Sequence, residues 1–234
     1  MFELKLGAAV REDGMVSFRV WAPRCQKVEV KIQDSRVPMA PDEHGYFSAD
    51  VQVVHPGQRY VYVLDETKER PDPVSRFQPE GVHGPSEVVD PAAFKWTDQK
   101  WKGLRLEPFV IYELHPGTFT PEGDFEAAAR KIPYLKELGV TCVEIMPVAQ
   151  FPGKRNWGYD GVGLYAVQNS YGGPEGLKKF VNACHRAGLA VCLDVVYNHF
   201  GPEGNYLHDF GPYFSGRYHT PWGDAVNYDD SYCD

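Results

Sequence analysis

Residues 189–199 read LAVCLDVVYNH, and this stretch decides the fold. It opens as a run of apolar, largely β-branched residues, which is typical of a strand buried on both faces of a parallel sheet. Asp194 lies inside the run, and three polar residues end it, Tyr197, Asn198 and His199. In α/β proteins, ligands and chemistry gather at the carboxyl ends of the strands. We therefore expect a buried strand here whose polar end forms part of a functional site.

Two strand–helix–strand units lead up to this stretch. Residues 109–114, 140–146 and 189–196 are predicted strands. Asp124 is suited to cap a helix between the first two strands, and Pro133 should kink that helix. Its predicted apolar face consists of Phe125, Ala128, Ala129, Ile132, Leu135 and Leu138. Successive units of this kind predict a parallel sheet with right-handed crossovers.

The second helix is bounded by Pro174 at its first position and by Gly188 just past its end. Its predicted apolar face consists of Leu177, Phe180, Val181, Cys184 and Ala187. Each helix returns to the next strand through a single glycine, Gly139 or Gly188, whereas the segments that follow the strands are long. This asymmetry is typical of a (β/α)8 TIM barrel, whose functional side carries the strand-to-helix loops.

The length of the second half predicts an incomplete barrel. A complete one takes about 250 residues, and residues 108–234 have room for about three strands. Either these residues form a small open sheet or the chain stops partway round a barrel. We favour the second and expect residues 108–234 to be the first part of a (β/α)8 barrel, truncated at residue 234. The third strand would then have an unpaired outer edge, which invites aggregation. Poor solubility is expected unless another chain, such as a complementing C-terminal barrel segment, completes the sheet.

In the first 88 residues, the apolar residues recur with the two-residue period of a β-strand. Apolar and polar residues alternate in runs that turn residues separate. The inward positions are Val16, Phe18 and Val20, then Val28, Val30 and Ile32, then Phe47, Ala49, Val51 and Val53, then Tyr60, Tyr62 and Leu64. Short alternating strands without a helical segment predict an immunoglobulin-like β-sandwich over 1–88. A Pro-rich stretch from Arg70 to Pro91 has turn residues but no period, so we expect it to fold against its neighbours. A linker is expected over 89–107. The predicted fold class is therefore multidomain β + α/β.

The composition argues against certain binding partners and indicates the cellular compartment. The formal net charge is −8 and the pI is about 5.5, so nucleic acid and an anionic membrane would be repelled on average. No apolar run approaches the ~18 residues of a membrane span, and Met1 does not begin a signal peptide. The cysteines are Cys25, Cys142, Cys184, Cys192 and Cys233. Their scattered positions favour reduced thiols in a cytoplasmic protein and argue against a zinc site.

The sequence NWGYDG after the second strand is a further candidate site. Trp157 and Tyr159, flanked by glycines and followed by Asp160, would form a flat apolar platform with a polar edge. Such a platform suits the C–H faces and hydroxyl rims of a pyranose ring, although the rings could also serve only to fix a long loop. Asp194 and His199 are suited to hydrogen-bond sugar hydroxyls or to orient a catalytic acid. The alternative is that Asp194 caps loop amides and that His199 is a core histidine.

The segment 200–228 is rich in aromatic residues. We expect it to fold above the strand ends, with most rings in a small core of its own and two or three against a ligand. His115 ends the first strand and is expected to hold that turn. The sequence contains no phosphate-binding loop, GxSxG elbow, HExxH motif or Cys/His metal set. Nucleotide binding, serine hydrolysis and zinc catalysis are therefore unsupported.

Several longer segments carry a family resemblance. They are VIYELHPGTFTPEGDF, YLKELGVTCVEIMPVAQFPGKRNWGYDGVGLYAV, YGGPEGLKKFVNACHRAGLAVCLDVVYNH and YHTPWGDAVN. Together they resemble the α-amylase superfamily of retaining glycosidases, glycoside hydrolase family 13. The front part, GAAVREDGMVSFRVWAP, resembles the β-sandwich module that precedes the barrel in members of this family. Within the family, the chain is most similar to the trehalohydrolases.

The resemblance implies cleavage of the α-1,4 bond next to the trehalose end of maltooligosyltrehalose, with retention of configuration. It implies that Tyr159 stacks on the sugar at the cleavage subsite, that His199 hydrogen-bonds this sugar and that Asp194 supports the site. The predicted substrate-binding set is Tyr159, His199, Asp194, Trp157, Asp160 and Asn198. Asn198 corresponds to a calcium-binding position in many amylases. The trehalohydrolases are not known for needing calcium, so no metal or cofactor is expected.

The family's catalytic carboxylates would lie beyond Asp234. Members place a nucleophilic Asp, an acid/base Glu and a stabilising Asp at later barrel strands, and retaining hydrolysis requires a carboxylate pair roughly 5 to 5.5 Å apart. We therefore expect no catalytic residue within this chain and no glycoside hydrolysis by the chain alone. Two other interpretations stay open, a fragment of an α-1,4-glucan branching enzyme and a non-catalytic glucan-binding protein. The sequence TPWGD at 220–224 favours the trehalohydrolases over the branching enzymes.

Overall fold

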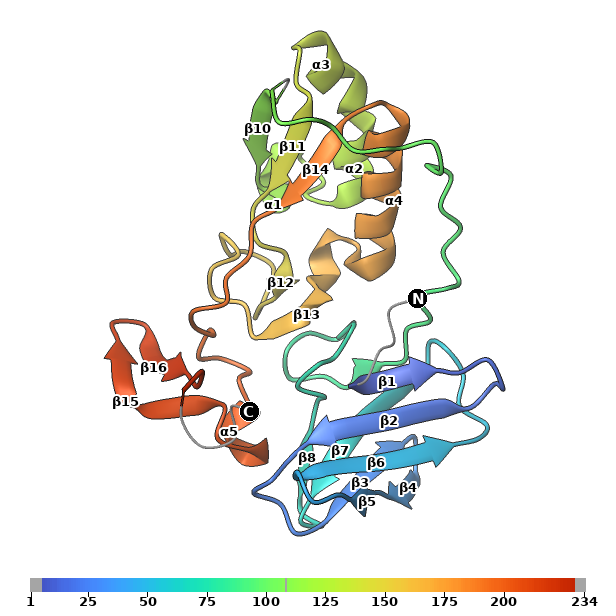
Figure 1. Ribbon diagram of the computed structural model, residues 1–234, viewed down its shortest axis with the longest axis vertical. Coiled ribbons are helices and arrows are strands. Elements are labelled where there is room, and N and C mark those ends of the chain that lie inside the picture. The colour runs from blue at the N-terminus through green and yellow to red at the C-terminus, as the bar shows by residue number, and fades with distance from the viewer. Residues whose placement is uncertain (1–5, 108, 230–234) are drawn as a thin grey trace.

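The computed structural model describes residues 6–107 and 109–229, and these residues form two hydrophobic cores. One core lies between the antiparallel sheets at the bottom of Figure 1, and the other lies between a parallel sheet and its helices at the top. The predicted fold class, a β-sandwich followed by a parallel α/β part, is confirmed. The domain boundaries at residues 88 and 107 stay predictions.

The sandwich consists of two antiparallel sheets, with strand orders β1-β2-β6-β5 and β4-β3-β7-β8, and β9 also pairs with β7. The strands are β1 (Gly7–Val10), β2 (Val16–Trp21), β3 (Val28–Ile32), β4 (Ser35–Pro38), β5 (Ala40–Pro41), β6 (Tyr46–Val51), β7 (Arg59–Leu64), β8 (Lys68–Arg70) and β9 (Ser86–Glu87). Inward residues such as Phe18, Val30 and Tyr62 are fully buried, which confirms the alternation. The prediction for Val53 is wrong, because β6 ends at Val51 and a φ of 62° turns the 82% exposed Val53 outward.

A carboxylate is buried inside the sandwich. Asp72 is only 4% exposed. It accepts hydrogen bonds from the hydroxyl of Tyr60 at 2.6 Å, from the hydroxyl of Tyr62 at 3.3 Å and from the backbone N–H of Val74 at 2.9 Å. Removal from water raises the pKa of Asp72 from 3.8 to about 6, and the hydrogen bonds offset only part of that effect.

The linker over 89–107 packs along helix α4 (Gly173–Arg186), as Figure 1 shows. The Asp98 carboxylate lies 2.6 Å from Nδ1 of His185. The ring of Trp101 stacks on the same imidazole, with 4.7 Å between the centroids. The linker is therefore held against α4 by these contacts.

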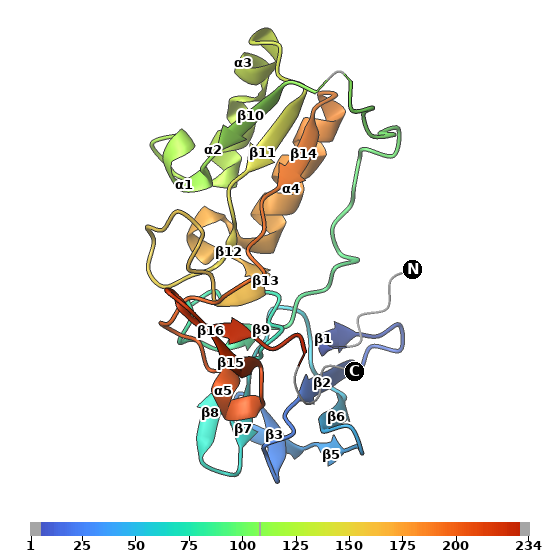
Figure 2. The ribbon, with the colours of Figure 1, turned by 60° about the vertical axis from the view of Figure 1, so that its left-hand side comes forward.

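The parallel sheet has the order β10-β11-β14, and both pairings are parallel. Its strands are β10 (Ile111–Leu114), β11 (Cys142–Ile145) and β14 (Ala190–Leu193). Figure 2 shows the helices behind this sheet, while its other face is open within the described part of the chain. The strand-to-helix crossovers predicted from the sequence are confirmed.

Two stretches of this part, after Asp124 and from Pro174, are helical close to the predicted residues, and the short α1 was not predicted. The helices are α1 (Pro116–Phe119), α2 (Phe125–Arg130), α3 (Ile132–Glu137) and α4. The Asp124 side chain caps α2 by accepting a hydrogen bond from the backbone N–H of Ala127 at 2.8 Å. Pro133 lies in the first turn of α3, so the predicted kink is a break between two short helices. Leu138 follows the end of α3 and is 56% exposed, so its predicted place on the apolar face is wrong.

The prediction that 189–196 is buried on both faces is also wrong. β14 ends at Leu193, which is 43% exposed, and Val195 is 45% exposed. The physical reason is position, because β14 pairs only with β11 and lies at an edge of the sheet within the described residues. Leu193 and Val195, which are residue types typical of a central strand, are therefore exposed to solvent.

The long connections contain short elements that the sequence did not predict. They are β12 (Ala149–Gln150), β13 (Gly163–Val167) and the 3-10 helix η1 (Asn169–Tyr171) before α4, and α5 (Leu207–Phe210), β15 (Phe214–Thr220) and β16 (Gly223–Val226) after β14. The predicted separate core for 200–228 is wrong in one respect. Phe210 is 1% exposed and belongs to the core of the β-sandwich.

The four described cysteines, Cys25, Cys142, Cys184 and Cys192, are free thiols, as predicted. Cys233 lies outside the described residues. Burial raises the pKa of Cys184 to about 12, so this thiol stays protonated. Within 6–107 and 109–229, no helix combines the length and the apolar composition that crossing a bilayer requires.

Asp72 should make the stability of the sandwich depend on pH. Between pH 3.8 and about 6, the folded state holds a proton on Asp72 that the unfolded state has released. The free energy of unfolding should therefore fall as pH rises through this window, by roughly 3 kcal/mol at most. Asp72→Asn should remove that contribution, which urea unfolding at several pH values would measure. Asp50→Asn, at an exposed acid of the same domain, should keep the wild-type slope, and equal slopes in all three proteins would contradict the prediction.

Candidate functional site

The ends of the parallel strands meet at one edge of the sheet. The backbone N–H of Asp194 donates to the carbonyl of Ile145 at 2.9 Å, so hydrogen bonding continues one residue past β14 and fixes Asp194. The hydroxyl of Tyr159 donates to Oδ2 of Asp194 at 3.1 Å. The structure thus brings together Tyr159, from the segment after β11, and Asp194, from the end of β14. Their roles toward a ligand stay predictions.

His115 holds the loop that carries Tyr159. Its Nε2 lies 2.6 Å from the carbonyl oxygen of Asn156, and because a carbonyl only accepts, Nε2 carries the proton. The other ring nitrogen, Nδ1, lies 3.3 Å from the hydroxyl of Thr118, which can donate to it. Asn156 in turn accepts the backbone N–H of Gly158 on its side-chain oxygen at 2.7 Å. His115 therefore does more than hold its own turn, because it links the end of β10 to this loop.

Backbone packing leaves no room for side chains at two glycines of the site. Gly158 has a φ of 100°, and a Cβ there would lie 2.2 Å from the carbonyl oxygen of Pro147. A Cβ on Gly201 would lie 2.2 Å from the carbonyl oxygen of Asp160. The backbone N–H of Gly201 also donates to the carbonyl of Gly161 at 3.0 Å. The segments after β11 and β14 are therefore packed backbone against backbone.

A groove of about 660 Å³ lies beside this loop. It is lined by His115, Gly117, Thr118, Lys154, Arg155, Asn156, Trp157, Tyr159 and Asp160. The indole of Trp157 is 77% exposed. Three members of the predicted set, Trp157, Tyr159 and Asp160, thus line one groove. Flat rings surrounded by amide, hydroxyl and carboxylate groups and by the cations Lys154 and Arg155 suit a ligand rich in hydroxyls.

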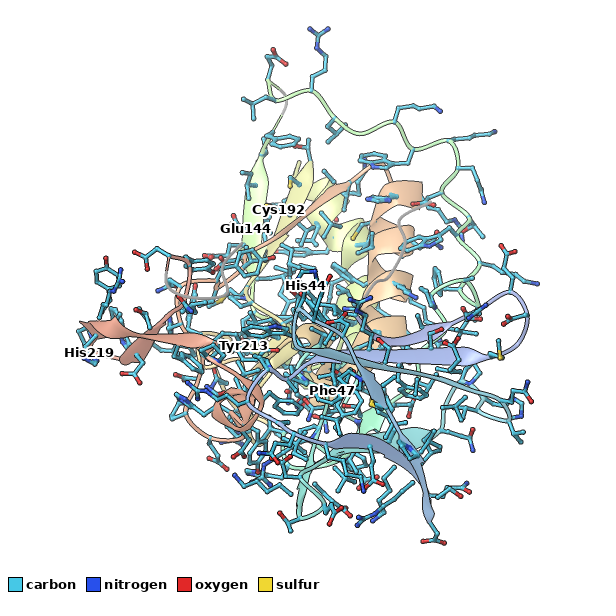
Figure 3. The ribbon with its side chains drawn as sticks, turned by 60° about the horizontal axis from the view of Figure 1, so that its bottom comes forward. His44, Phe47, Glu144, Cys192, Tyr213 and His219 are labelled. Carbon is cyan, nitrogen blue, oxygen red and sulfur yellow. The ribbon has the colours of Figure 1, made fainter. Side chains whose placement is uncertain are left out.

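An acidic layer lies on the sheet face opposite the helices. Glu113, Glu144 and Cys192 occupy the same register on the three strands, and Figure 3 shows Glu144 and Cys192 close together. Removal from water raises the pKa of Tyr159 above its ordinary value, and the hydrogen bond to Asp194 and the charges of Asp194, Glu113 and Glu144 raise it further. The phenol of Tyr159 is therefore held in its neutral, hydrogen-bonding form.

In the part of the chain that the structure describes, neither Asp160 nor Asn198 hydrogen-bonds Asp194 or Tyr159, and their roles toward a ligand stay predictions. Oδ2 of Asp160 accepts a hydrogen bond from the side-chain amide of Asn156 at 3.1 Å, within the loop itself. Asn198 is exposed beyond the end of β14. Within the described residues, no group of three or more His, Cys, Asp or Glu side chains is arranged to hold a metal ion.

His199 is paired with the hairpin β15–β16. Its ring stacks on the ring of Trp222, with 5.8 Å between the centroids and 28° between the planes. Its Nδ1 is buried and has no hydrogen-bond partner in the structure. An unpaired buried nitrogen is costly, so a ligand hydroxyl or a water at this position would be stabilised. The sequence singled out His199 and the TPWGD segment, which contains Trp222, but it did not predict that the two are in contact.

Glu113 and Glu144 are the residues of this region that sequence reasoning missed. Each is the single charge in an apolar strand, in VIYEL and in CVEIM. The same signal, a charge inside a buried run, singled out Asp194. Applied to all three strands, it would have predicted an acidic inner face.

The chain matches two known families along its length. Residues 88–220 match the family described as alpha amylase, catalytic domain, and residues 5–92 match carbohydrate-binding module 48 (isoamylase N-terminal domain). The chain is 57% identical over 229 residues to malto-oligosyltrehalose trehalohydrolase of Saccharolobus solfataricus, a match that covers 97% of this chain and 40% of that protein. It is 35% identical over 215 residues to 1,4-alpha-glucan branching enzyme GlgB 2 of Xanthomonas campestris pv. campestris, which covers 83% of this chain and 30% of that enzyme.

The fold also matches a solved structure. The crystal structure of a putative alpha amylase from Salmonella typhimurium superposes with a TM-score of 0.95 at 49% identity, covering 99% of this chain and 40% of that one. The chain therefore spans about 40% of the length of the Saccharolobus solfataricus and Salmonella typhimurium proteins and 30% of the length of the branching enzyme.

Gly158 should be far less tolerant of substitution than other glycines of its loop. Gly158→Ala places a Cβ on the Pro147 carbonyl and should lower the free energy of unfolding by about 3 kcal/mol or more. Gly153→Ala is the matched control, because Gly153 also has a positive φ, 74°, but nothing lies within 4 Å of its Cβ position. Its cost should be only about 1–2 kcal/mol. Equal costs in urea unfolding would contradict the packing described for this loop.

Proposed function

Because the chain belongs to the alpha-amylase catalytic-domain family, we propose that it is part of a glycoside hydrolase that releases trehalose from maltooligosyltrehalose. The reaction is retaining cleavage of the α-1,4 bond next to the trehalose unit. The choice within the family is supported by 57% identity to a trehalohydrolase against 35% to a branching enzyme. The family resemblance predicted from the sequence is confirmed.

The hydrogen bond between Tyr159 and Asp194 is the observation that carries the site assignment. It fixes the phenol ring of Tyr159 at the wall of the groove, so the ring face is preorganised to stack on a sugar. Asp194 holds that ring and supplies a carboxylate acceptor for sugar hydroxyls. Trp157 and Asp160 line the same groove and extend the contact surface.

His199 is assigned a hydrogen bond to the sugar. Its buried Nδ1 has no hydrogen-bond partner in the structure, and its stacking on Trp222 fixes the ring plane. Asn198 is assigned a contact at the rim, since it is exposed next to His199. Positioned polar groups of this kind orient a neutral substrate without a metal or a cofactor.

The catalytic carboxylates are proposed to come from sequence outside this chain. A retaining glycosidase needs a nucleophile and an acid/base roughly 5 to 5.5 Å apart across the bond, and the candidate set here assigns no residue to either role. The exposed edge of β14, with Leu193 and Val195 against water, is where a complementing C-terminal barrel segment would pair.

A non-catalytic glucan-binding role is the second candidate. The match of residues 5–92 to a carbohydrate-binding module favours it. A fragment of a branching enzyme has the same support from the family match. Its reaction would act on an α-1,4-glucan and transfer the cleaved chain to a glucan hydroxyl in place of water.

The binding assignment is tested by titrating the chain with maltoheptaose. Tyr159→Ala should weaken binding about tenfold, since an aromatic contact is worth up to about 1.5 kcal/mol beyond its buried area. Tyr134→Ala removes another exposed tyrosine, from α3, and should leave the affinity unchanged. Micromolar binding that Tyr159→Ala leaves intact would favour the sandwich as the binding site and overturn this assignment.

Catalysis is tested with maltotriosyltrehalose. The purified chain should release no trehalose above a vector-only control if, as proposed, the carboxylate pair comes from sequence outside it. Release above that control would show that the catalytic groups lie within the chain.

A further inference from the structure

Residues 203–213 follow β14 in sequence but lie on the β-sandwich, where Figure 2 shows α5 beside β7 and β8. Phe210 is 1% exposed, and its ring meets that of Tyr62 at a centroid distance of 6.4 Å. The backbone carbonyl of Phe210 accepts the N–H of Arg24 at 3.2 Å. The core of the sandwich is therefore completed by a side chain from the other half of the protein.

Asp209, next to Phe210, is held by two cations of β8. Its carboxylate oxygens lie 2.6 Å from Nζ of Lys68 and 2.7 Å from Nε of Arg70. Burial alone would raise the pKa of Asp209, but the hydrogen bonds and charges of Lys68 and Arg70 outweigh it and hold that pKa below its ordinary value. The Arg70 guanidinium also lies over the ring of Tyr206, 4.6 Å from its centroid. Charge and packing thus act on the same short segment.

Tyr213 forms the last contact before the hairpin. Its hydroxyl donates to the backbone carbonyl of Trp21 at 3.2 Å, and the two rings meet edge to face at 5.0 Å. A Cβ on Gly211 would lie 3.1 Å from the ring of Trp21, so the chain passes close to the sandwich here. In Figure 3, Tyr213 lies where the hairpin meets the rest of the protein, and His219 lies near the outer end of the hairpin.

The hairpin β15–β16 continues directly from this contact. The carbonyl of Tyr213 accepts the backbone N–H of Asn227 at 2.9 Å, and the carbonyl of Pro212 accepts its side-chain amide at 3.0 Å. The turn of the hairpin carries Trp222, which stacks on His199. A continuous series of contacts therefore joins the sandwich to a residue of the candidate site.

We propose that the β-sandwich is a positioning element of the candidate site, because it holds the β15–β16 hairpin beside His199. Phe210, Asp209 and Tyr213 are the positioning residues through which it acts. The inference rests on the proposed function in one respect, since it treats the hairpin as a wall of a glucan site. It differs from the view of the sandwich as an independent binding module, because the module's own core includes a segment of its neighbour.

Hydrogen exchange of the hairpin amides, followed by mass spectrometry on the whole chain, tests this inference. Arg70→Gln and Asp209→Asn should each speed exchange over residues 214–226 about tenfold, the loss expected for a charged hydrogen bond. The effect of the double variant should be smaller than the two single effects combined, because both substitutions remove the Arg70–Asp209 ion pair. Exchange in β2 and β6 should stay at the wild-type rate, which a general loss of stability would not allow.

Arg36→Gln is the matched control. Arg36 is an exposed arginine of β4 that pairs with Glu29 and Glu69 at 3.7 and 3.6 Å and does not touch residues 203–213. It should leave the hairpin exchange unchanged. Phe210→Ala should lower the thermal unfolding midpoint of the sandwich by opening a cavity in its core, and the surface variants remain informative if this protein does not fold.

Wild-type exchange over 214–226 in both Arg70→Gln and Asp209→Asn would overturn the inference. No glucan takes part in this measurement, so the result is independent of the proposed function. A chain that binds maltoheptaose but shows unchanged hairpin exchange would lose only the positioning role. A chain that binds no maltoheptaose but shows faster exchange in the variants would keep the positioning role and lose the glucan assignment.

Discussion

The parallel pairing of β10, β11 and β14 is the constraint on which the rest of this half depends. Parallel neighbours cannot be joined by tight turns, so each connection must cross from one end of the sheet to the other. The helices α2, α3 and α4 make these crossings on one face. The ends of all three strands then lie at a single edge, and Tyr159 and Asp194 meet there although they are distant in the sequence. The site follows from the direction of the strands.

The elements that were predicted correctly have local signals. Asp124 caps α2, Pro133 breaks the helix after it, and Gly188 follows α4 with a φ of 77°. Each of these residues acts on its own few neighbours, so the sequence alone is sufficient. The meeting of Tyr159 with Asp194 was also predictable, because strand direction and loop order place both at the same edge.

The features that were not predicted depend on distant parts of the chain. Nothing around Phe210 indicates that its ring enters the core of the sandwich, since the partners that bury it, such as Tyr62, are far away in sequence. Leu193 and Val195 look like core residues, and their exposure comes from the edge position of β14. The hairpin β15–β16 and the stacking of Trp222 on His199 depend on the same docking. Local pattern does not specify contacts of this kind.

The contacts of the linker with α4 bear on how a long polymer would approach this protein. A free tether between two domains lets one domain search a volume around the other and raises the effective concentration of whatever it carries. Here the linker is attached to α4. Asp98 hydrogen-bonds His185, Trp101 stacks on the same ring, and Thr97 donates its backbone N–H to the side chain of Asn182 at 2.9 Å. The two halves are therefore joined at this point and again where the ring of Phe210 enters the core of the sandwich. A glucan strand bound on the sandwich would therefore enter the groove at one fixed angle. The arrangement of the two halves, and not the length of a flexible linker, would direct it there.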